Sequence, residues 1–290
     1  MTLAQLLASS PALLAGLCFF FGLLIGSFLN VVIYRLPVMM ERAWQQEARE
    51  LLDQPANPDQ PPFNLVTPRS RCPSCNHQIR WYENVPLVSW LALRGRCSAC
   101  GGAISIRYPL IELTAGLLAL TTALTLGYSP WLLPALLAGW CLLALAMIDF
   151  DTTLLPDSLT LPLLWAGLLL ALVGLSPVSL ADAVAGAAAG YLALWSVYWL
   201  FKLLTGKEGM GYGDFKLLAA LGAWLGWQLL PLVILLSSLV GAVVGGVLMA
   251  TGLVHRNQGI PFGPYLAAAG WIALLWGPDL VNAYLGLFRF

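Results

Sequence analysis

The chain has 290 residues, of which 59% are apolar and only 10% are charged. Soluble globular domains carry about 25% charged residues, so the charge content is less than half of theirs, and the high hydrophobicity excludes intrinsic disorder. The 14 basic residues balance the 14 acidic ones, which argues against a general nucleic-acid binder. This composition is typical of a membrane protein with several spans and a small polar insert.

The first apolar segment, Pro11 to Ile33, is long enough to cross a bilayer, which takes roughly 20 apolar residues. Met1 to Ser10 contains no Lys or Arg, so a cleavable signal peptide is not indicated and a permanent membrane helix is expected. From Arg35 to Arg107 the chain is polar and rich in proline and cysteine, which predicts a domain outside the membrane. Within this domain, residues 41–53 predict a solvated helix that links the first span to the cysteines.

Seven further apolar segments follow, separated by short breaks rich in turn-forming residues. They are expected at about residues 109–127, 131–148, 159–175, 183–204, 215–229, 231–253 and 261–284. The break at Gln228 to Pro231 is the weakest, so seven spans remain an alternative to eight. The breaks include the stretch His255 to Gly259. The sequence therefore predicts an all-α polytopic membrane protein with about eight transmembrane helices.

The basic residues define the orientation, because alternating spans place 13 of the 14 on one side and only Arg289 on the other. The positive-inside rule makes the basic side cytoplasmic. If 215–253 were one span, Arg256 would change sides and the rest would stay. Several spans also carry glycines four residues apart, which predicts close helix packing. These pairs are Gly22 and Gly26, Gly186 and Gly190, Gly222 and Gly226, and Gly241 and Gly245.

Four of the six cysteines form two Cys-x-x-Cys turns, Cys72 to Cys75 and Cys97 to Cys100. Two such turns can complete a tetrahedral four-sulfur shell around one metal ion. The spacer of 21 residues is one beyond the usual range for paired turns. Two disulfides are the alternative, but the predicted cytosolic location is reducing. We therefore predict a structural zinc site in a small cytosolic insert after the first helix.

The remaining metal-binding side chains are interpreted as structural. His77 could replace a ligand, but with four thiolates nearby we expect it to be a surface neighbour of the site. Cys18 and Cys141 lie inside apolar spans, where cysteine behaves as a small hydrophobic residue.

Two aspartates lie at span ends on the predicted cytoplasmic side. Asp149 follows the apolar run Leu142 to Ile148, and Asp214 ends the motif Gly211 to Asp214 at the start of another span. An ionisable group at the edge of a span is costly and predicts a function. Two carboxylates held close together share a proton, so one can accept a proton from water while the other donates to a carbonyl oxygen. That is the arrangement of an aspartic protease, with a structural polar contact as the alternative.

The other acidic residues are interpreted differently. Asp157 and Asp182 are each expected to cap the start of a span. Asp151 is either a solvated loop residue or a support for Asp149. Glu112 lies inside the second span and is expected to pair with a buried donor in a supporting role. The run Gly206 to Gly213 is not a P-loop, because its lysine is followed by Glu and no strand precedes it.

Four motifs in this order resemble the bacterial type IV prepilin peptidase family of GxGD aspartyl membrane proteases. They are the run Gly26 to Pro37, the two Cys-x-x-Cys turns, the segment Ile148 to Asp157, and Gly-Tyr-Gly-Asp at 211–214. The resemblance covers nearly the whole chain. Presenilin and signal peptide peptidase relatives share GxGD, but their first Asp follows Tyr and they lack the cysteine module, whereas archaeal preflagellin peptidases resemble only the C-terminal part.

The resemblance implies a leader peptidase that cuts the basic leader of type IV prepilins and type II secretion pseudopilins after a glycine, at the cytoplasmic face of the bacterial inner membrane. It also implies that the enzyme then methylates the new N-terminal residue with S-adenosylmethionine. By motif position, the catalytic pair becomes Asp149 and Asp214, and the zinc ligands become Cys72, Cys75, Cys97 and Cys100. No Rossmann-type strand and glycine-rich turn is visible, so the methyl-donor site is unknown, with Asn30 to Pro37 as a hypothesis.

Two other function classes are compatible with parts of the sequence. In an ion-coupled transporter, Asp149 and Asp214 would form a proton relay, although relay acids usually lie near the midplane. A scaffold docking partners through the zinc module would leave both acids unexplained. We expect three domains: a first transmembrane helix at 1–34, a cytosolic zinc domain at 35–108 and a membrane-embedded peptidase domain at 109–290. Expected partners are the pilin substrates and the lipid bilayer, with no nucleic acid.

Overall fold

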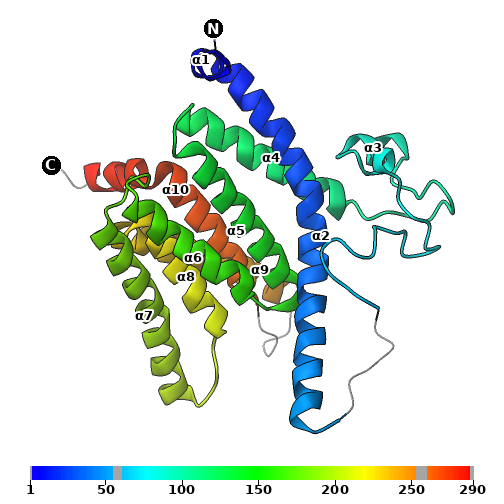
Figure 1. Ribbon diagram of the computed structural model, residues 1–290. Helices are drawn as coiled ribbons and strands as arrows, with labels where there is room; N and C mark the ends of the chain where they lie inside the picture. Colours follow the sequence, from blue (N-terminus) through cyan, green and yellow to red (C-terminus); the bar gives the residue numbers. More distant parts are fainter. Residues whose placement is uncertain (1, 55–60, 253–259, 288–290) are drawn as a thin grey trace. The chain divides into compact units, whose positions relative to one another are not determined.

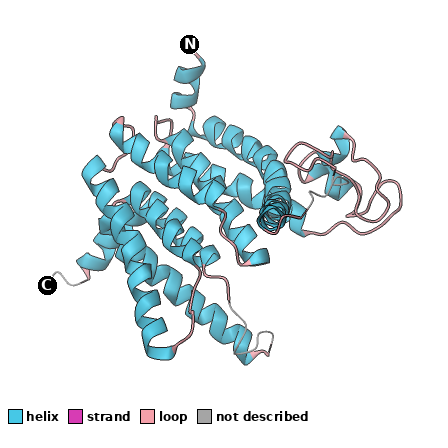
Figure 2. Cartoon of the chain, turned by 60° about the horizontal axis from the view of Figure 1, so that its bottom comes forward, coloured by secondary structure: helices cyan, strands magenta, loops and turns pink. Residues whose placement is uncertain are grey.

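The computed structural model describes residues 2–54, 61–252 and 260–287, and within these ranges it contains helices and no strand (Figures 1 and 2). By internal packing the chain forms two units, Met1–Tyr128 and Ser129–Phe290. The expected break at His255 to Gly259 and the basic residues Arg256 and Arg289 lie outside the described residues. The division into domains 1–34, 35–108 and 109–290 is a functional one and stays a prediction.

The first unit is built on a long helix. Its elements are α1 (Leu3–Ser9), α2 (Pro11–Leu51), the 3-10 helix η1 (Trp81–Asn84), α3 (Val88–Ala92) and α4 (Arg107–Leu126). Helix α2 contains both the predicted first span and the predicted solvated helix. It does not end at Tyr34 and Arg35, where the apolar run ends, but passes through Pro37. A proline removes one helical hydrogen bond, and the strong helix formers after Pro37 continue the helix beyond it.

Glycines hold α2 close to α4, as the four-residue spacing predicts. A Cβ atom at Gly22 would lie 2.7 Å from the carbonyl oxygen of Ala115, and one at Gly26 would lie 2.6 Å from Cα of Glu112. Only glycine permits this backbone approach. One turn further along α2, Nδ2 of Asn30 donates to the carbonyl oxygen of Tyr108 at 3.2 Å. These contacts fix the register of the two helices.

The second unit consists of α5 (Leu132–Thr152), α6 (Asp157–Leu172), α7 (Leu180–Thr205), α8 (Tyr212–Leu225), the 3-10 helix η2 (Trp227–Leu229), α9 (Leu230–Ala250) and α10 (Gly263–Gly286). Together with α2 and α4, its helices match the eight predicted apolar segments. In the described part of the chain, six are long and apolar enough to span a membrane, which makes this a multi-pass membrane protein.

Helices α6 and α8 are shorter than the expected spans. They contain 16 and 14 residues. At 1.5 Å per residue they reach about 24 and 21 Å, less than the roughly 30 Å of hydrocarbon in a bilayer. The predicted segments 159–175 and 215–229 are nearly the right length but lie two to four residues too far towards the C-terminus, because the apolar character continues into the turns that follow each helix.

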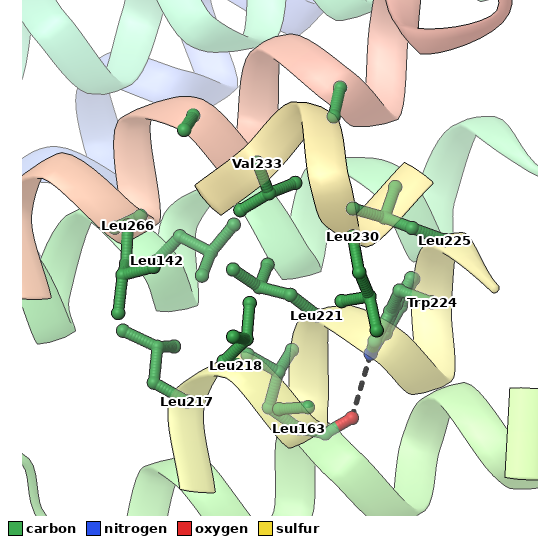
Figure 3. Close-up of a cluster of buried hydrophobic side chains, with 14 of the residues drawn as sticks. Leu142, Leu163, Leu217, Leu218, Leu221, Trp224, Leu225, Leu230, Val233 and Leu266 are labelled. Atoms are coloured by element: carbon green, nitrogen blue, oxygen red, sulfur yellow. Dashed lines mark hydrogen bonds between the residues drawn. The ribbon is translucent and has the colours of Figure 1, made fainter. Parts of the chain in front are cut away.

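Helix α8 lies at the centre of the second unit, packed against α6, α7 and α10 (Figure 1). From Asp214 to Leu225 nearly every residue is buried. Figure 3 shows Leu217, Leu218 and Leu221 of α8 among apolar side chains from its neighbours. In the same view, Nε1 of Trp224 donates to the carbonyl oxygen of Leu163 in α6 at 2.7 Å. The central helix is therefore held by both apolar packing and a buried hydrogen bond.

Glycines also bring α7 onto α8. Gly186 and Gly222 contact each other directly, and a Cβ at Gly190 would lie 2.5 Å from the carbonyl oxygen of Leu218. Gly226 serves a different purpose, because it ends α8 with a φ of 75°, in the left-handed region that favours glycine. The weak break near Gln228 is therefore a true helix end.

Asp182 stabilises that helix end rather than capping α7. The N-cap of α7 is Ser179, and the Asp182 carboxylate accepts hydrogen bonds from Nε1 of Trp227 at 3.0 Å and Nε2 of Gln228 at 2.9 Å. The prediction that Asp157 is an N-cap is also wrong. Pro156 occupies the cap position of α6, and Asp157 is the first helical residue, paired with Nζ of Lys216 at 2.7 Å.

Candidate functional site

Asp149 lies in the last turn of α5 and is 5% exposed. Its Oδ2 atom accepts a hydrogen bond of 2.9 Å from the backbone N–H of Gly263, the first residue of α10. A backbone N–H at a helix start has no partner within its own helix, so it is available to a carboxylate. The carboxylate of α5 is thereby fixed against the beginning of α10.

Asp214 is the third residue of α8 and is 7% exposed. Gly211 precedes the helix in an extended conformation, and the chain turns into α8 at Tyr212. Within the described residues, the Oδ1 atom of Asp214 is buried without a hydrogen-bond partner. Buried carboxylate oxygens in folded proteins are normally hydrogen-bonded, so Oδ1 can accept a hydrogen bond from a water or a substrate that no protein group already fills.

Two glycines, at the starts of α8 and α10, bring Asp214 and Asp149 towards the same neighbouring side chain. Leu155, in the turn between α5 and α6, packs beside them. A Cβ at Gly213 would lie 2.7 Å from Cβ of Leu155, and a Cβ at Gly263 would lie 3.2 Å from its Cδ2. Two glycines thus allow the starts of α8 and α10 to close around one leucine, next to the aspartates.

Gly263 is also in close contact with the carboxylate itself. A Cβ at this position would lie 2.7 Å from Oδ2 of Asp149 and 3.1 Å from its Cγ. Such separations are well below the usual contact distance, so any side chain at 263 has to displace the carboxylate. Sequence reasoning missed Gly263. The available signal was the pair Gly263-Pro264 at the start of an apolar segment, where proline begins a helix and glycine permits close approach.

A second polar cluster supports the loop that leads to Asp214. Nζ of Lys202, near the end of α7, donates to Oε1 of Glu208 at 2.8 Å and to the hydroxyl oxygen of Tyr198 at 3.1 Å. The hydrogen bond from Lys202 lowers the pKa of Glu208, so this carboxyl is charged at neutral pH. The rings of Tyr198 and Tyr212 lie 5.4 Å apart. These contacts connect both ends of the loop to α7.

The remaining acidic candidates have other positions. Asp151 is exposed on the last turn of α5, and its two interpretations stay open. Glu112 belongs to the first unit, where its Oε2 accepts the backbone N–H of Leu87 at 2.9 Å and its carboxylate also bonds the Ser27 side chain. Glu112 therefore joins α4 to the cysteine module, and the expected buried donor is this backbone N–H.

The four predicted metal ligands come together in the first unit. Ligand atoms of Cys72, Cys75, Cys97 and Cys100 all lie within 4.8 Å of one another. The sulfurs of Cys72 and Cys100 are 3.9 Å apart, and those of Cys75 and Cys97 are 4.0 Å apart. A tetrahedral zinc site with bonds of about 2.3 Å needs sulfur–sulfur separations of about 3.8 Å. The cluster fits a metal ion, whereas a disulfide would require about 2.05 Å.

The two cysteine turns have the same backbone structure, repeated after 25 residues. The N–H of Cys72 donates to the carbonyl oxygen of His77 at 2.9 Å, and the N–H of Cys97 donates to that of Gly102 at 2.8 Å. Asn76 and Gly101 follow the second cysteine of each turn with φ of 58° and 70°. These left-handed residues direct backbone N–H groups towards the sulfurs, and the N–H groups of Cys75 and Ser74 lower the pKa of Cys72 to about 6.

Glu83 connects the two cysteine turns. Its carboxylate accepts hydrogen bonds from the hydroxyl group of Ser98 at 2.5 Å and from the backbone N–H of Arg80 at 2.7 Å, and it contacts Nε2 of His77 at 3.4 Å. The hydrogen bond from Ser98 is the largest cause of a lowered pKa for Glu83. His77 is therefore held beside the cluster by Glu83, while the four sulfurs form the cluster itself.

Arg35 ties the segment before the cysteines to α2. Its guanidinium donates to the carbonyl oxygens of Asn64 at 2.8 Å and Pro68 at 2.6 Å, and the side chain is buried. It also lies 5.6 Å from the ring centre of Phe63. Arginine is suited to this role because its guanidinium presents several donors in one plane.

Comparisons with known protein families divide the chain at nearly the same place as its internal packing does. Residues 20–126 match the bacterial peptidase A24 N-terminal domain, and residues 136–246 match the type IV leader peptidase family. The boundary between the two matches falls near the division between the two units.

Curated relatives match along the whole chain. A prepilin leader peptidase/N-methyltransferase of Stutzerimonas stutzeri is 60% identical over 100% of both chains, and that of Aeromonas hydrophila is 60% identical over 99% of both. The protein of the same name from Pseudomonas aeruginosa is 57% identical over 98% of both chains. No solved structure matches. With full-length identity at this level, the chain belongs to the type IV leader peptidase family.

Proposed function

We propose that this protein is an aspartic endopeptidase that removes the leader of type IV prepilins and pseudopilins, and that it then N-methylates the new first residue. The relatives at 57 to 60% identity are named as prepilin leader peptidase/N-methyltransferases. The observation that carries the proposal is the pair of buried carboxylates, Asp149 and Asp214, at the ends of two helices of one unit. The transporter alternative has no support among the relatives.

The proposed cleavage step needs only these two carboxyl groups and water. The charged member of the pair accepts a proton from a water molecule, whose oxygen attacks the carbonyl carbon of the scissile peptide bond. The neutral member donates its proton to the carbonyl oxygen, which gives a tetrahedral intermediate with two hydroxyl groups. As the C–N bond breaks, the first carboxyl gives the proton that it took from water to the leaving nitrogen, and the second carboxylate recovers a proton from one hydroxyl group, which leaves a carboxylic acid and an amine. The hydrogen bond from Gly263 holds Asp149 in position. The partnerless oxygen of Asp214 leaves one lone-pair direction for the water or the carbonyl group.

The length of α8 is evidence that the site lies near the membrane surface. At about 21 Å it is shorter than the hydrocarbon layer by roughly 9 Å, so at least one of its ends lies within membrane depth. Asp214 is at one of these ends. A substrate whose own membrane helix lies beside the enzyme would present its cleavage site at this level. We place this face on the cytoplasmic side of the bacterial inner membrane, because the basic residues gather there.

We propose that the four-cysteine cluster holds one structural Zn²⁺. All four positions of a tetrahedral shell are taken by Cys72, Cys75, Cys97 and Cys100. A closed shell leaves no position for a substrate or a water, so its role is to fold the module. For the second activity, S-adenosylmethionine would supply an electrophilic methyl group to the N-terminal amine that cleavage releases. We place its site near Asn30 to Pro37, where Arg35 joins α2 to the segment before the cysteines.

The test is a cleavage assay with purified protein in detergent and a full-length prepilin, read by mass spectrometry. We expect the native protein to release the leader and Asp149→Asn and Asp214→Asn to lose turnover, since an amide cannot exchange the proton. The matched control is Asp182→Asn in α7, which contacts the residues after the far end of α8. Asparagine keeps one acceptor oxygen for Trp227 and Gln228, so this variant should cleave normally. Cleavage by either active-site variant at the native rate would disprove the assignment.

The methyl-donor site is tested separately. S-adenosylmethionine with a radioactive methyl group is crosslinked to the protein by ultraviolet light, and the labelled peptide is identified. Label in the peptides that contain Asn30 to Pro37 or the neighbouring cysteine module is the expected result. Label confined to the second unit would refute this placement and leave the peptidase assignment untouched.

A further inference from the structure

The cysteine module carries a short segment with large apolar side chains exposed outside any membrane span. In residues 81–91, Trp81 is 84% exposed, Leu91 is 67% exposed and Val88 is 62% exposed. Tyr82 and Val85 between them are exposed as well. Single exposed apolar side chains are ordinary, but five within eleven residues indicate a surface that contacts something apolar.

The internal packing of the module explains why these side chains face outwards. The hydroxyl group of Ser89 donates to the carbonyl oxygen of Tyr82 at 2.7 Å and accepts the N–H of Val85 at 3.0 Å. Nε1 of Trp90 donates to the carbonyl oxygen of Ile104 at 3.2 Å. Ser89 and Trp90 therefore form the inner side of α3. Val88 and Leu91, three residues apart on the same helix, are left on its outer side.

A hydrogen bond fixes the depth of this segment relative to a membrane helix. The N–H of Leu87 donates to Oε2 of Glu112 at 2.9 Å, and Glu112 lies five residues inside α4. At 1.5 Å per residue this is about 7 to 8 Å along the helix from Arg107. Because α4 has 20 residues, it needs its full length of about 30 Å to cross the hydrocarbon layer. Leu87 is consequently held within about 7 to 8 Å of the bilayer boundary, and not far out in the solvent.

The charge of the module is complementary to anionic lipids. Residues 61–107 contain six arginines and only one acidic residue, Glu83. Basic side chains next to a span are attracted to the negative surface of anionic membranes, and tryptophan and tyrosine favour the headgroup region. The six arginines are Arg69, Arg71, Arg80, Arg94, Arg96 and Arg107.

We propose that residues 81–91 dock the cysteine module onto the anionic lipid surface beside α4. Val88 and Leu91 enter the boundary between headgroups and acyl chains, Trp81 and Tyr82 lie at the headgroup level, and the arginines contact lipid phosphates. The module is then a membrane-seated domain and not one suspended in the cytosol by α2. All residues involved belong to the first unit, so the docking does not depend on the peptidase reaction.

The experiment uses the full-length protein in nanodiscs that contain a trace of a phospholipid with a photoactivatable diazirine in its acyl chain. Light converts the diazirine to a carbene that inserts into neighbouring side chains, and mass spectrometry locates the labelled peptides. The internal reference is the peptide 41–50 of α2. Since Asn30 contacts Tyr108 at the start of α4, residue 41 lies about 16 Å further along the helix and outside the bilayer.

We expect peptide 81–93 to be labelled several-fold more than peptide 41–50, and more strongly with phosphatidylglycerol present than with phosphatidylcholine alone. The double variant Val88→Glu with Leu91→Glu should lose this labelling. Val66→Glu, which adds one glutamate at another exposed apolar position of the module, should keep it, and each single glutamate variant should keep more of it than the double variant. Retention of bound metal in all variants shows that the module is folded.

Two results would overturn the proposal, and neither requires a variant. Labelling of 81–93 at the level of 41–50, together with fast amide hydrogen exchange, would mean that the segment is open to water. The same weak labelling with slow exchange would mean that protein covers it, either the second unit or another chain.

Discussion

The contact between Gly263 and Asp149 gives the sharpest prediction. In Gly263→Ala the new methyl group would lie 2.7 Å from Oδ2 of Asp149, on a backbone whose own N–H holds that oxygen at 2.9 Å. An ordinary contact needs about 3.4 Å, so the carboxylate has to retreat by about 0.7 Å. The methyl group pushes away the same oxygen that the backbone N–H of residue 263 holds. Asp149 therefore has to leave its native position and weaken its hydrogen bond to that N–H.

The expected consequence is a loss of turnover with little loss of stability. Misplacing a catalytic group by about 1 Å can cost about 100-fold in rate, so a shift of this size predicts a decrease of about 10- to 100-fold in kcat. The value of KM should change little, because the rest of the substrate site is intact. The unfolding free energy should fall by no more than about 1 to 2 kcal/mol, the range for tight packing and one weakened hydrogen bond.

The assay is steady-state cleavage of a full-length prepilin, with thermal unfolding measured in the same detergent. Gly286→Ala is the matched control, because it adds the same methyl group at the other end of α10, where nothing lies within 4 Å. If Gly263→Ala cleaves with native kcat while folded, then Asp149 either does not move or does not act in the reaction, and the reasoning fails.

Three further predictions concern the cysteine module and the core. Cys72→Ser should lose bound metal and destabilise the first unit by several kcal/mol, whereas Cys18→Ser should keep both the metal and the stability. Metal analysis and thermal unfolding measure the two effects. Stoichiometric zinc in Cys72→Ser with an unchanged melting temperature would contradict the prediction. Glu112→Ala should cost about 1 to 3 kcal/mol in unfolding free energy because it leaves the Leu87 N–H without its acceptor. Glu112→Gln keeps an acceptor oxygen and should cleave normally, so a catalytic defect in the Gln variant would show that the charge itself is needed. Trp224→Phe should cost about 1 to 3 kcal/mol, because it removes the buried N–H that donates to the Leu163 carbonyl and the packing of the larger ring. Trp165→Phe, at an exposed position of α6, should change stability by less than about 0.5 kcal/mol, and equal effects would refute the role of the buried side chain.

Local patterns determined much of this protein from the sequence alone. Eight apolar segments, the four-cysteine cluster and the helix end near Gln228 all follow from composition and short spacing, which depend on neighbouring residues. The glycine pairs in α2 and α7 also indicated their packing faces, because small residues four apart lie on one side of a helix. Boundaries were less accurate, since an apolar turn such as the one after α6 cannot be distinguished from a helix by hydropathy.

Contacts between distant segments were decided only by the tertiary structure. Asp182 and Asp157 looked alike as caps in the sequence, yet one holds Trp227 and Gln228 and the other pairs with Lys216. The approach of Gly263 to Asp149 joins residues 114 positions apart, and the bond from Leu87 to Glu112 joins a loop to a membrane helix. A sequence shows which groups a chain carries, but which backbone N–H meets which carboxylate depends on helix packing over the whole unit, and no local pattern encodes that packing.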